Sequence, residues 1–439
     1  MPFIANSDAD RRAMLERIGV GSIEELFSDI PAKRRFPSLN IGEPLSELEV
    51  LREIEAMAAK NVTASTCAWF LGAGAYNHFI PAVVGAIASR GEFLTAYTPY
   101  QPEVSQGTLQ AIFEYQSMAA ALLGMEVVNA SHYDGATALA EAVLMAYNNG
   151  GGRHRVLLPA ALHPEYKEVI ATYFEAFEVE LVEYSGEPSA AGADEKTCCV
   201  VASYPDFDGE IRDLKAGAEA AHAAGALFVV HADPVMCALL KSPGELGADI
   251  VAAEGQSLGN AMNFGGPFLG MLGVTSKLVR KMPGRIVGQA KDAQGRRGFV
   301  LTLSAREQHI RREKAVSNIC SNQGLVMLQT CVYLALMGKK GMRTVAELCW
   351  NKAHYAAARI ATVPGFAVAT KTFFKEFTVK TPVPAEEICT KLTKRCVVPG
   401  LPMSRYEAKR SHELLVCVTE TCTKAQIDLL VESLKEASK

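Results

Sequence analysis

Residues that could do chemistry gather first in the segment AYTPYQPEVSQG, residues 96–107, where two prolines and two tyrosines stand among several polar side chains. Proline fixes φ, so this segment is expected to be a stiff, extended loop that presents side chains at little cost in conformational entropy. Tyr97, Tyr100 and Gln101 could therefore line a ligand pocket or a subunit interface. An ordinary rigid loop before a helix explains the same residues, and both interpretations stay open.

The segment NASHYDGATALAEA, residues 129–142, follows an apolar run and opens a helical pattern. The small residues 135–137 would leave amide hydrogens free at a helix N-terminus, which is a suitable place for an anion. Asp134 is an equally natural N-cap, which would occupy those donors and repel a phosphate. We expect the cap.

Two further segments could contribute to the same crevice. LFVVHADP ends a predicted strand with His231 and Asp233, which could do acid–base work or hold a heteroaromatic nitrogen. A hydrogen-bonded turn before Pro234 is at least as good an explanation. The Gly-rich segment EGQSLGNAMNFGGPFLG, residues 254–270, contains no lysine, cysteine or histidine.

A basic stretch runs from Lys277 to Lys314, with eleven Lys and Arg against three Asp and Glu. The whole chain has a net charge of −4, so this surplus of eight leaves −12 for the remainder. Four side chains here could meet carboxylates or phosphates, although a solvated helix face would look the same: Arg306, Arg311, Arg312 and Lys314.

The elements that must position these residues follow from the hydrophobic pattern. Short apolar runs alternate with helical patterns, which indicates a mainly parallel sheet covered on both faces. The runs are 125–128, 155–159, 179–184, 198–203, 227–230, 249–253 and 269–274. Ligands of such sheets lie at the carboxyl ends of the strands. We predict an N-terminal helical extension (1–61), a large α/β domain (62–320), and a linking helix with a small C-terminal α+β domain (321–439).

Composition excludes several classes of protein. The 439 residues carry 44 Lys and Arg against 48 Asp and Glu, which argues against a nucleic-acid binder. No apolar run reaches the roughly 18 residues that a membrane helix needs, and the first residues do not resemble a signal peptide. Eleven scattered cysteines without metal-type clustering indicate reduced thiols and no metal site. We expect a cytoplasmic enzyme.

Taken together, these segments resemble one family, the glycine decarboxylase (P-protein) of the glycine cleavage system. Within it, the chain is similar to the non-catalytic α subunit, or subunit 1, of the form split over two genes. The resemblance spans nearly the whole chain, and its most specific parts are YTPYQPEVSQG and REQHIRREKA. The segments that carry it lie at 70–81, 96–110, 129–142, 243–251, 263–270, 280–295 and 304–323.

The resemblance implies a fold-type-I pyridoxal-phosphate (PLP) enzyme of α/β class, with a mainly parallel large-domain sheet and a smaller C-terminal domain. The family decarboxylates glycine on PLP, which serves as an electron sink, and passes the aminomethyl group to the lipoyl arm of the H-protein. In the catalytic subunit a His-Lys pair precedes the GGP-containing loop, whereas Gly255–Asn260 offers no amine here. His231 also falls near the place of the aspartate that pairs with the pyridine nitrogen, and Asp233 is displaced.

These differences imply a subunit that does not anchor PLP. We expect a partner β subunit, subunit 2, to hold the cofactor in an α2β2 assembly, with glycine as substrate and the lipoylated H-protein as acceptor. Tyr97, Tyr100 and Gln101 are the residues expected to reach the partner's active site, with the 306–314 segment nearer its entrance. The alternatives are a stand-alone PLP decarboxylase or aminotransferase with a distant lysine, and a non-enzymatic binding or regulatory protein of the same fold.

Overall fold

The computed structural model describes residues 5–315, 317–319 and 323–438, and the chain divides into the units 1–62 and 63–439. The first unit contains two α-helices, α1 (Asp8–Ile18) and α2 (Glu47–Ala58), with 3-10 turns at Glu24–Phe27 and Ala32–Arg34. A capping box of Ser46 and Glu49 starts α2, whereas the similar pair of Ser22 and Glu25 precedes only a 3-10 turn. None of the described residues 5–62 is buried.

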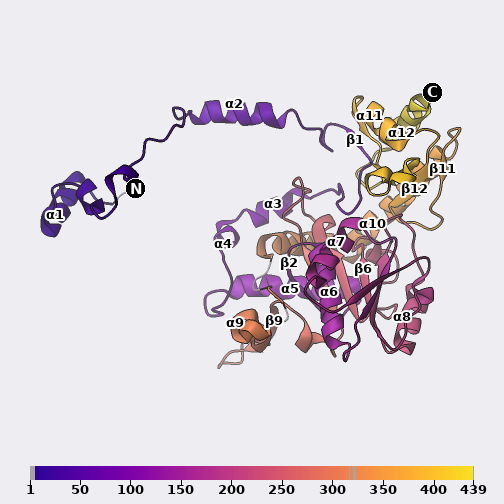
Figure 1. Cartoon of the computed structure of the whole chain (residues 1–439), viewed down its shortest axis with the longest axis horizontal. Helices are drawn as coiled ribbons and strands as arrows, with labels where there is room; N and C mark the ends of the chain where they lie inside the picture. Colours follow the sequence, from indigo (N-terminus) through magenta and orange to yellow (C-terminus); the bar gives the residue numbers. More distant parts are fainter. Residues whose placement is uncertain (1–4, 316, 320–322, 439) are drawn as a thin grey trace. The chain divides into compact units, whose positions relative to one another are not determined.

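A seven-stranded sheet forms the centre of the second unit (Figure 1). All seven predicted apolar runs are strands of this sheet, and all neighbouring pairs are parallel except those made by β8. The strands in spatial order are β2 (Val127–His132), β8 (Gly270–Val274), β7 (Ile250–Glu254), β6 (Leu227–Ala232), β5 (Thr197–Tyr204), β3 (Arg155–Pro159) and β4 (Glu180–Tyr184). The prediction of a mainly parallel sheet is confirmed.

Helices cover both faces of this sheet, because its strands are apolar on both sides. One face packs against α6 (Gly135–Asn149) and α7 (Pro164–Phe174), which share a core with alternate residues of the strands. The other face packs against α5 (Gln106–Leu123), α8 (Leu214–Ala223) and the first part of α10 (Gly324–Ile360). The short helices α3 (Ala82–Ala88) and α4 (Gly91–Leu94) precede α5.

The basic stretch forms a hairpin and a short helix. Strands β9 (Ile286–Lys291) and β10 (Arg297–Thr302) pair antiparallel around the predicted hairpin loop, and α9 spans Gln308–Arg311. Helix α10 then runs to the C-terminal part, with a break at Gly338, where φ is 56° and ψ is −175°. The break divides α10 into two helical stretches.

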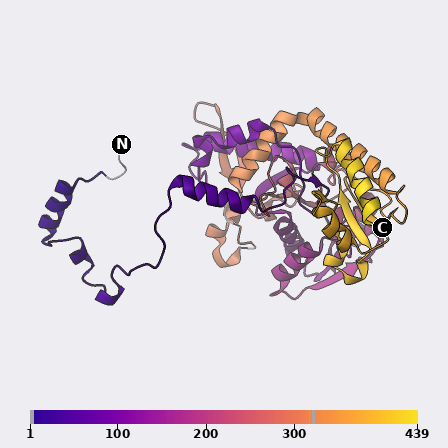
Figure 2. The ribbon, with the colours of Figure 1, turned by 90° about the horizontal axis from the view of Figure 1, so that it is seen from above.

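The C-terminal residues form a smaller sheet covered by helices, drawn in yellow at one end of this unit in both views (Figures 1 and 2). The sheet contains β11 (Ala367–Val368), β12 (Glu376–Lys380), β15 (Glu413–Cys417) and β14 (Leu401–Pro402), in that order. Helices α11 (Ala385–Thr393) and α12 (Lys424–Ala437) pack on it, and the predicted capping box of Thr423 and Gln426 begins α12. The expected α+β character is confirmed.

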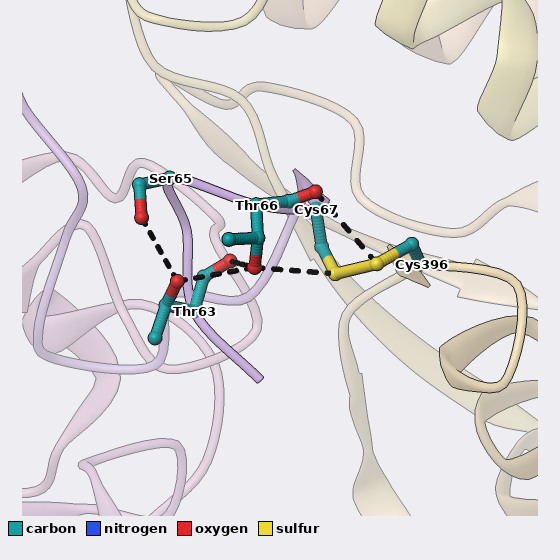
Figure 3. The surroundings of a disulfide bond; sticks show 5 residues. All are labelled: Thr63, Ser65, Thr66, Cys67 and Cys396. Atoms are coloured by element: carbon teal, nitrogen blue, oxygen red, sulfur yellow. Dashed lines mark hydrogen bonds between the residues drawn. A yellow bond between two sulfur atoms is a disulfide. The ribbon is translucent and has the colours of Figure 1, made fainter. Parts of the chain in front are cut away.

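A disulfide joins Cys67 to Cys396, 329 residues away (Figure 3). The two cysteines meet because β1 (Ala68–Trp69) pairs in parallel with β13 (Val397–Val398), directly after each of them. The expectation that all cysteines are reduced thiols is wrong for this pair, since sequence spacing does not reveal a strand pairing that brings distant thiols together.

Among the described residues, no helix combines the length and the apolar character that crossing a membrane requires.

Candidate functional site

A pocket opens at the carboxyl ends of the central strands, where the fold places ligands. Residues at the carboxyl ends of β5, β6 and β7 line it, together with residues of α7, residues 74 and 76, and Glu376. Its cavity volume is about 50 Å³. The lining includes both residues that the sequence singled out at the end of β6, His231 and Asp233. Small-molecule sites enclose about 300–1,000 Å³, so this pocket is largely filled by the protein.

Asp233 is paired with a lysine from the C-terminal part of the chain. Its Oδ2 lies 2.7 Å from Nζ of Lys375, and the two side chains are 6% and 1% exposed. Its Oδ1 accepts hydrogen bonds from the amides of Val235 and Met236. Burial alone would raise the pKa of Asp233, but Lys375 lowers it below its ordinary value, so the pair is ionised.

Aromatic and acidic groups surround the ammonium of Lys375. Its Nζ lies 3.5 Å from the ring centroid of Tyr76 and 3.2 Å from Nε2 of His78. Burial favours the neutral amine, yet Asp233 outweighs burial and raises the pKa of Lys375. The hydroxyl of Tyr76 donates to Glu376 at 2.6 Å, which fixes the ring over the lysine.

The N-terminus of α6, beside this pocket, is occupied by two carboxyl groups of the chain. Asp134 caps the helix as predicted, because its Oδ1 accepts from the amide of Thr137 at 2.8 Å. Glu254, at the end of β7, accepts from the amide of Gly135 at 2.7 Å through Oε2. Its Oε1 accepts from the amides of Gln256 at 2.8 Å and Leu269 at 3.2 Å.

Only glycine fits at position 135 beside this carboxyl group. A Cβ there would stand 2.8 Å from Cβ of Glu254 and 2.9 Å from the hydroxyl of Tyr166. The absence of a side chain therefore lets β7 approach the helix closely enough for Glu254 to reach its first amide. Two of the first three amides of α6, those of Gly135 and Thr137, are consequently already used.

Aromatic rings fill the rest of the pocket. Tyr166 stacks on His163 with centroids 4.9 Å apart and meets His231 edge-on at 4.9 Å. Burial lowers the pKa of His231 to about 4, with His163 lowering it further and Asp233 acting in the opposite direction. His231 is therefore neutral near pH 7, and it packs as a ring rather than acting as a charged group.

The residues in this pocket do not fit PLP. Two of the helix amides that would receive a phosphate hold Glu254 and Asp134, and Asp233, the acid that follows β6 in this pocket, holds Lys375. The loop Gly255–Asn260, which carries no lysine, instead bonds to itself and to its neighbours. The side chain of Gln256 accepts a hydrogen bond from the amide of Tyr76 and donates one to its carbonyl. The side chain of Asn260 donates to the hydroxyl of Thr330.

The predicted loop residues lie outside this pocket. Tyr97 is 85% exposed and lines a separate apolar hollow of about 110 Å³ between α5 and α10. Gln101 is exposed, and its backbone carbonyl accepts from Val104. The hydroxyl of Tyr100 accepts a hydrogen bond from Nη2 of Arg285 at 3.0 Å, and the guanidinium lies 4.6 Å from the ring centroid. The three residues thus share a loop and no cavity.

Arg285 joins this loop to the basic segment. Its Nε donates to Glu307 at 3.0 Å, and both side chains are buried. At the end of the loop, the side chain of Gln106 bonds both the amide and the carbonyl of Phe299 in β10. The loop is therefore fixed at two points while its outer side chains stay exposed.

A basic pocket of about 260 Å³ lies beside the C-terminal end of α6. Arg306, Arg311 and Lys314 line it together with Arg280 and Lys281, whereas Arg312 is absent from its lining. The guanidinium of Arg306 donates to the carbonyls of Met282 and Gly284, and its Nε has no partner among the described residues. Burial lowers the pKa of Arg306, and Glu307 opposes that effect.

The one cluster with metal-type side chains among the described residues contains His78, Cys349 and Glu420. Nδ1 of His78 lies 2.6 Å from Glu420, and the ammonium of Lys375 stands 3.2 Å from the other ring nitrogen. Burial raises the pKa of Glu420, but His78 outweighs it and lowers the pKa to about 2. A fixed positive charge beside the cluster disfavours a cation there, so the prediction of no metal site stays.

The sequence does not single out the two side chains that decide the character of the pocket, Glu254 and Lys375, nor Arg285, which fixes the loop of residues 97–101. Glu254 was named only as part of a Gly-rich loop, and Arg285 only as part of a charge surplus. Lys375 stands in the apolar run FFKEF, where a lysine followed by a glutamate could have signalled a buried ion pair.

Comparison with known proteins identifies the family and the fold. The pattern of the glycine cleavage system P-protein family matches residues 1–434. A protein of Thermomicrobium roseum called probable glycine dehydrogenase (decarboxylating) subunit 1 is 49% identical over the full length of both chains. The crystal structure of a glycine decarboxylase (P-protein) in inhibitor-bound form aligns over 100% of both chains, with a TM-score of 0.91 and 45% identity. A sphingosine-1-phosphate lyase from Burkholderia pseudomallei, 16% identical with a TM-score of 0.65 over 93% of this chain and 94% of its own, shares the fold. The architecture is that of fold-type-I PLP-dependent enzymes.

Proposed function

The chain belongs to the glycine cleavage system P-protein family, and we propose that it is subunit 1 of a two-subunit glycine dehydrogenase (decarboxylating). In this proposal the complex decarboxylates glycine, releases CO2 and transfers the aminomethyl group to the lipoyl arm of the H-protein in the cytoplasm. Subunit 2 carries the lysine and the PLP, and two copies of each subunit form the assembly.

The observation that carries this proposal is the occupied pocket at the carboxyl ends of the strands. A stand-alone PLP enzyme needs an amine for the cofactor and free donors for its phosphate. Here Gly255–Asn260 has no lysine, and Glu254 takes the amide of Gly135. The buried ammonium of Lys375 forms an ion pair with Asp233. These contacts support a subunit whose contribution lies outside its own pocket.

The loop of residues 97–101 is the part that we propose reaches the partner's active site. Tyr97, Tyr100 and Gln101 are exposed, while Arg285 and Gln106 hold the loop in place from behind. A loop that is fixed at its base and exposed at its tip can position side chains in another chain without a large entropy cost.

We propose that the basic pocket receives acidic side chains of the lipoylated H-protein near the entrance of that site. Five cations line it, and Glu307, the one acidic residue among the described residues of the lining, is paired with Arg285. The half-buried guanidinium of Arg306 donates to the carbonyl oxygens of Met282 and Gly284, and Nε has no partner among the described residues. Such a site attracts carboxylates, and Arg binds them with two parallel hydrogen bonds.

Reconstitution with subunit 2 of the same organism tests the proposal. The two chains should co-purify, and glycine–bicarbonate exchange should require both of them together with the lipoylated H-protein. Each subunit assayed alone with the H-protein is the control. Failure to form a complex, or exchange by subunit 2 alone at the rate of the mixture, would contradict the proposal.

A further inference from the structure

We infer that Glu254 and Lys375 take the places of the two polar ends of the fold's cofactor, its phosphate and its ring nitrogen. The pocket is then closed to PLP, bound non-covalently as well as covalently, by the chain's own side chains. This inference rests on the pocket and the fold, and it holds whether or not the proposed complex forms.

The phosphate end is represented by Glu254. In parallel α/β proteins a phosphate binds at a helix N-terminus that follows a strand, where free amides point at the anion. Glu254 presents two oxygens to three amides at this position, those of Gly135, Gln256 and Leu269, at 2.7–3.2 Å. A phosphate would have to displace a buried side chain that already satisfies every one of these donors.

The ring-nitrogen end is represented by Lys375. PLP enzymes place an acidic residue against the protonated pyridine nitrogen, which is a buried N–H cation. Asp233 at the end of β6 meets a buried N–H cation here as well, but that cation is the ammonium of Lys375 at 2.7 Å. The lysine comes from the C-terminal part of the chain, so the contact also ties that part to the large sheet.

Aromatic side chains occupy the space between these two ends. A Cβ on Gly135 would meet the hydroxyl of Tyr166 at 2.9 Å, and the ring of Tyr166 stacks on His163 and meets His231 edge-on. The cavity that remains is about 50 Å³. Glu254 and Lys375 thus make the contacts that a bound cofactor would make in this fold. These contacts hold the large sheet, α6 and the C-terminal part together.

The inference predicts that removing Glu254 creates an anion site. In Glu254→Ala, three buried amides lose their acceptor, so the variant should unfold at a lower temperature than the wild type. Inorganic phosphate should then raise its unfolding temperature progressively, as mass action requires of a ligand that binds only the folded state. Chloride at equal ionic strength serves as the salt control.

Glu141→Ala is the matched control variant. Glu141 is buried in α6, the helix whose first amide Glu254 binds. Its carboxylate accepts a hydrogen bond from Ser317 and contacts no helix N-terminus. This variant also loses a buried acid, so phosphate should raise its unfolding temperature no more than it raises that of the wild type. The wild type should behave in the same way as this control.

Pyridoxine 5′-phosphate is the second probe, because it carries the phosphate and the ring nitrogen but no aldehyde that could react with surface lysines. Calorimetric titration of the full chain should show no saturable binding to the wild type up to about 1 mM. If Glu254→Ala does not fold, Glu254→Gln keeps an acceptor oxygen and should give the phosphate response in weaker form.

Saturable binding of pyridoxine 5′-phosphate to the wild type would overturn the inference. A folded Glu254→Ala that responds to phosphate no more than Glu141→Ala does would also overturn it. Because these readouts use the chain alone and measure no turnover, they are independent of whether subunit 2 forms an active complex.

Discussion

Arg285 donates two hydrogen bonds from one edge of its guanidinium, from Nη2 to the hydroxyl of Tyr100 at 3.0 Å and from Nε to Glu307 at 3.0 Å. One buried guanidinium therefore connects the two segments that the sequence marks as most specific, although 185 residues separate Arg285 from Tyr100. The position of the loop and that of the basic segment are consequently set by the same side chain.

Tyr100→Phe should lower the exchange activity of the reconstituted complex about tenfold or more, because a hydrogen bond to a charged group contributes about 1.5–3 kcal/mol. Co-purification with subunit 2 should be unchanged, since the aromatic ring remains over Arg285. Val104→Ala, in the same exposed loop, is the control and should keep its activity. Exchange activity of Tyr100→Phe equal to that of the wild type would contradict a role of this hydroxyl in the partner's active site and leave the loop with a structural role alone.

Lys375→Met should reduce the free energy of unfolding by about 3–5 kcal/mol, because it leaves Asp233 buried without its counter-charge. Urea denaturation measures this change. The double variant Lys375→Met/Asp233→Asn should recover much of the loss, since neither charge is then buried alone. Lys409→Met, whose side chain is 83% exposed, should change stability by less than about 0.5 kcal/mol. If Lys375→Met and Lys409→Met changed the free energy of unfolding equally, Lys375 and Asp233 would not form a buried ion pair.

The pH dependence of stability should contain a contribution from Glu254. Burial raises the pKa of this carboxyl group to about 8 in the folded chain, assisted by Asp134 and opposed by the amides of Gly135, Leu269 and Gln256. Since the folded pKa exceeds the ordinary 4.5, its stabilising effect is full below pH 4.5 and is lost as pH rises towards 8.

Glu254→Gln cannot take up this proton, so its free energy of unfolding should fall less steeply between pH 5 and 8 than that of the wild type. The difference in slope should be at most about 1.4 kcal/mol for each pH unit. Parallel denaturation curves at several pH values measure it. Identical slopes in the two proteins would mean that the pKa of Glu254 is not raised.

Charge reversal in the basic pocket should weaken the response to the H-protein. Arg311→Glu and Lys314→Glu together should raise the KM for the lipoylated H-protein severalfold and leave kcat nearly unchanged. The effect should shrink at high salt, since the Debye length is about 8 Å at physiological ionic strength. Lys409→Glu, outside this pocket, is the control. A KM unaffected by the double reversal would exclude this pocket from docking.

Deletion of residues 1–62 tests the N-terminal unit. None of its described residues is buried, and Leu48, Leu51 and Ile54 form an exposed apolar row on α2. Thermal unfolding of the shortened chain should therefore match that of the full chain, whereas co-purification with subunit 2 should weaken. A large fall in unfolding temperature would show instead that this unit stabilises the remainder of its own chain.

The sequence predicts the elements well because the signals are local. Apolar runs such as 198–203 and capping boxes such as that of Ser46 and Glu49 mark strands and helix starts from residues close in the chain. The N-cap role of Asp134 was predictable for the same reason.

The contacts that define the pocket and hold the loop of residues 97–101 were not predictable, because they join distant residues. Lys375 reaches Asp233 and Arg285 reaches Tyr100 only after the sheet order is set, and no spacing rule connects them. The disulfide of Cys67 and Cys396 depends in the same way on the β1 and β13 pairing.

We propose that subunit 2 alone holds the cofactor of the complex. Borohydride reduction of the active complex, followed by mass spectrometry of both chains, locates the pyridoxyl group directly. We predict one pyridoxyl lysine on subunit 2 for each pair of subunits, and none on this chain, Lys375 included. A stoichiometric pyridoxyl group on any lysine of this chain would contradict the account.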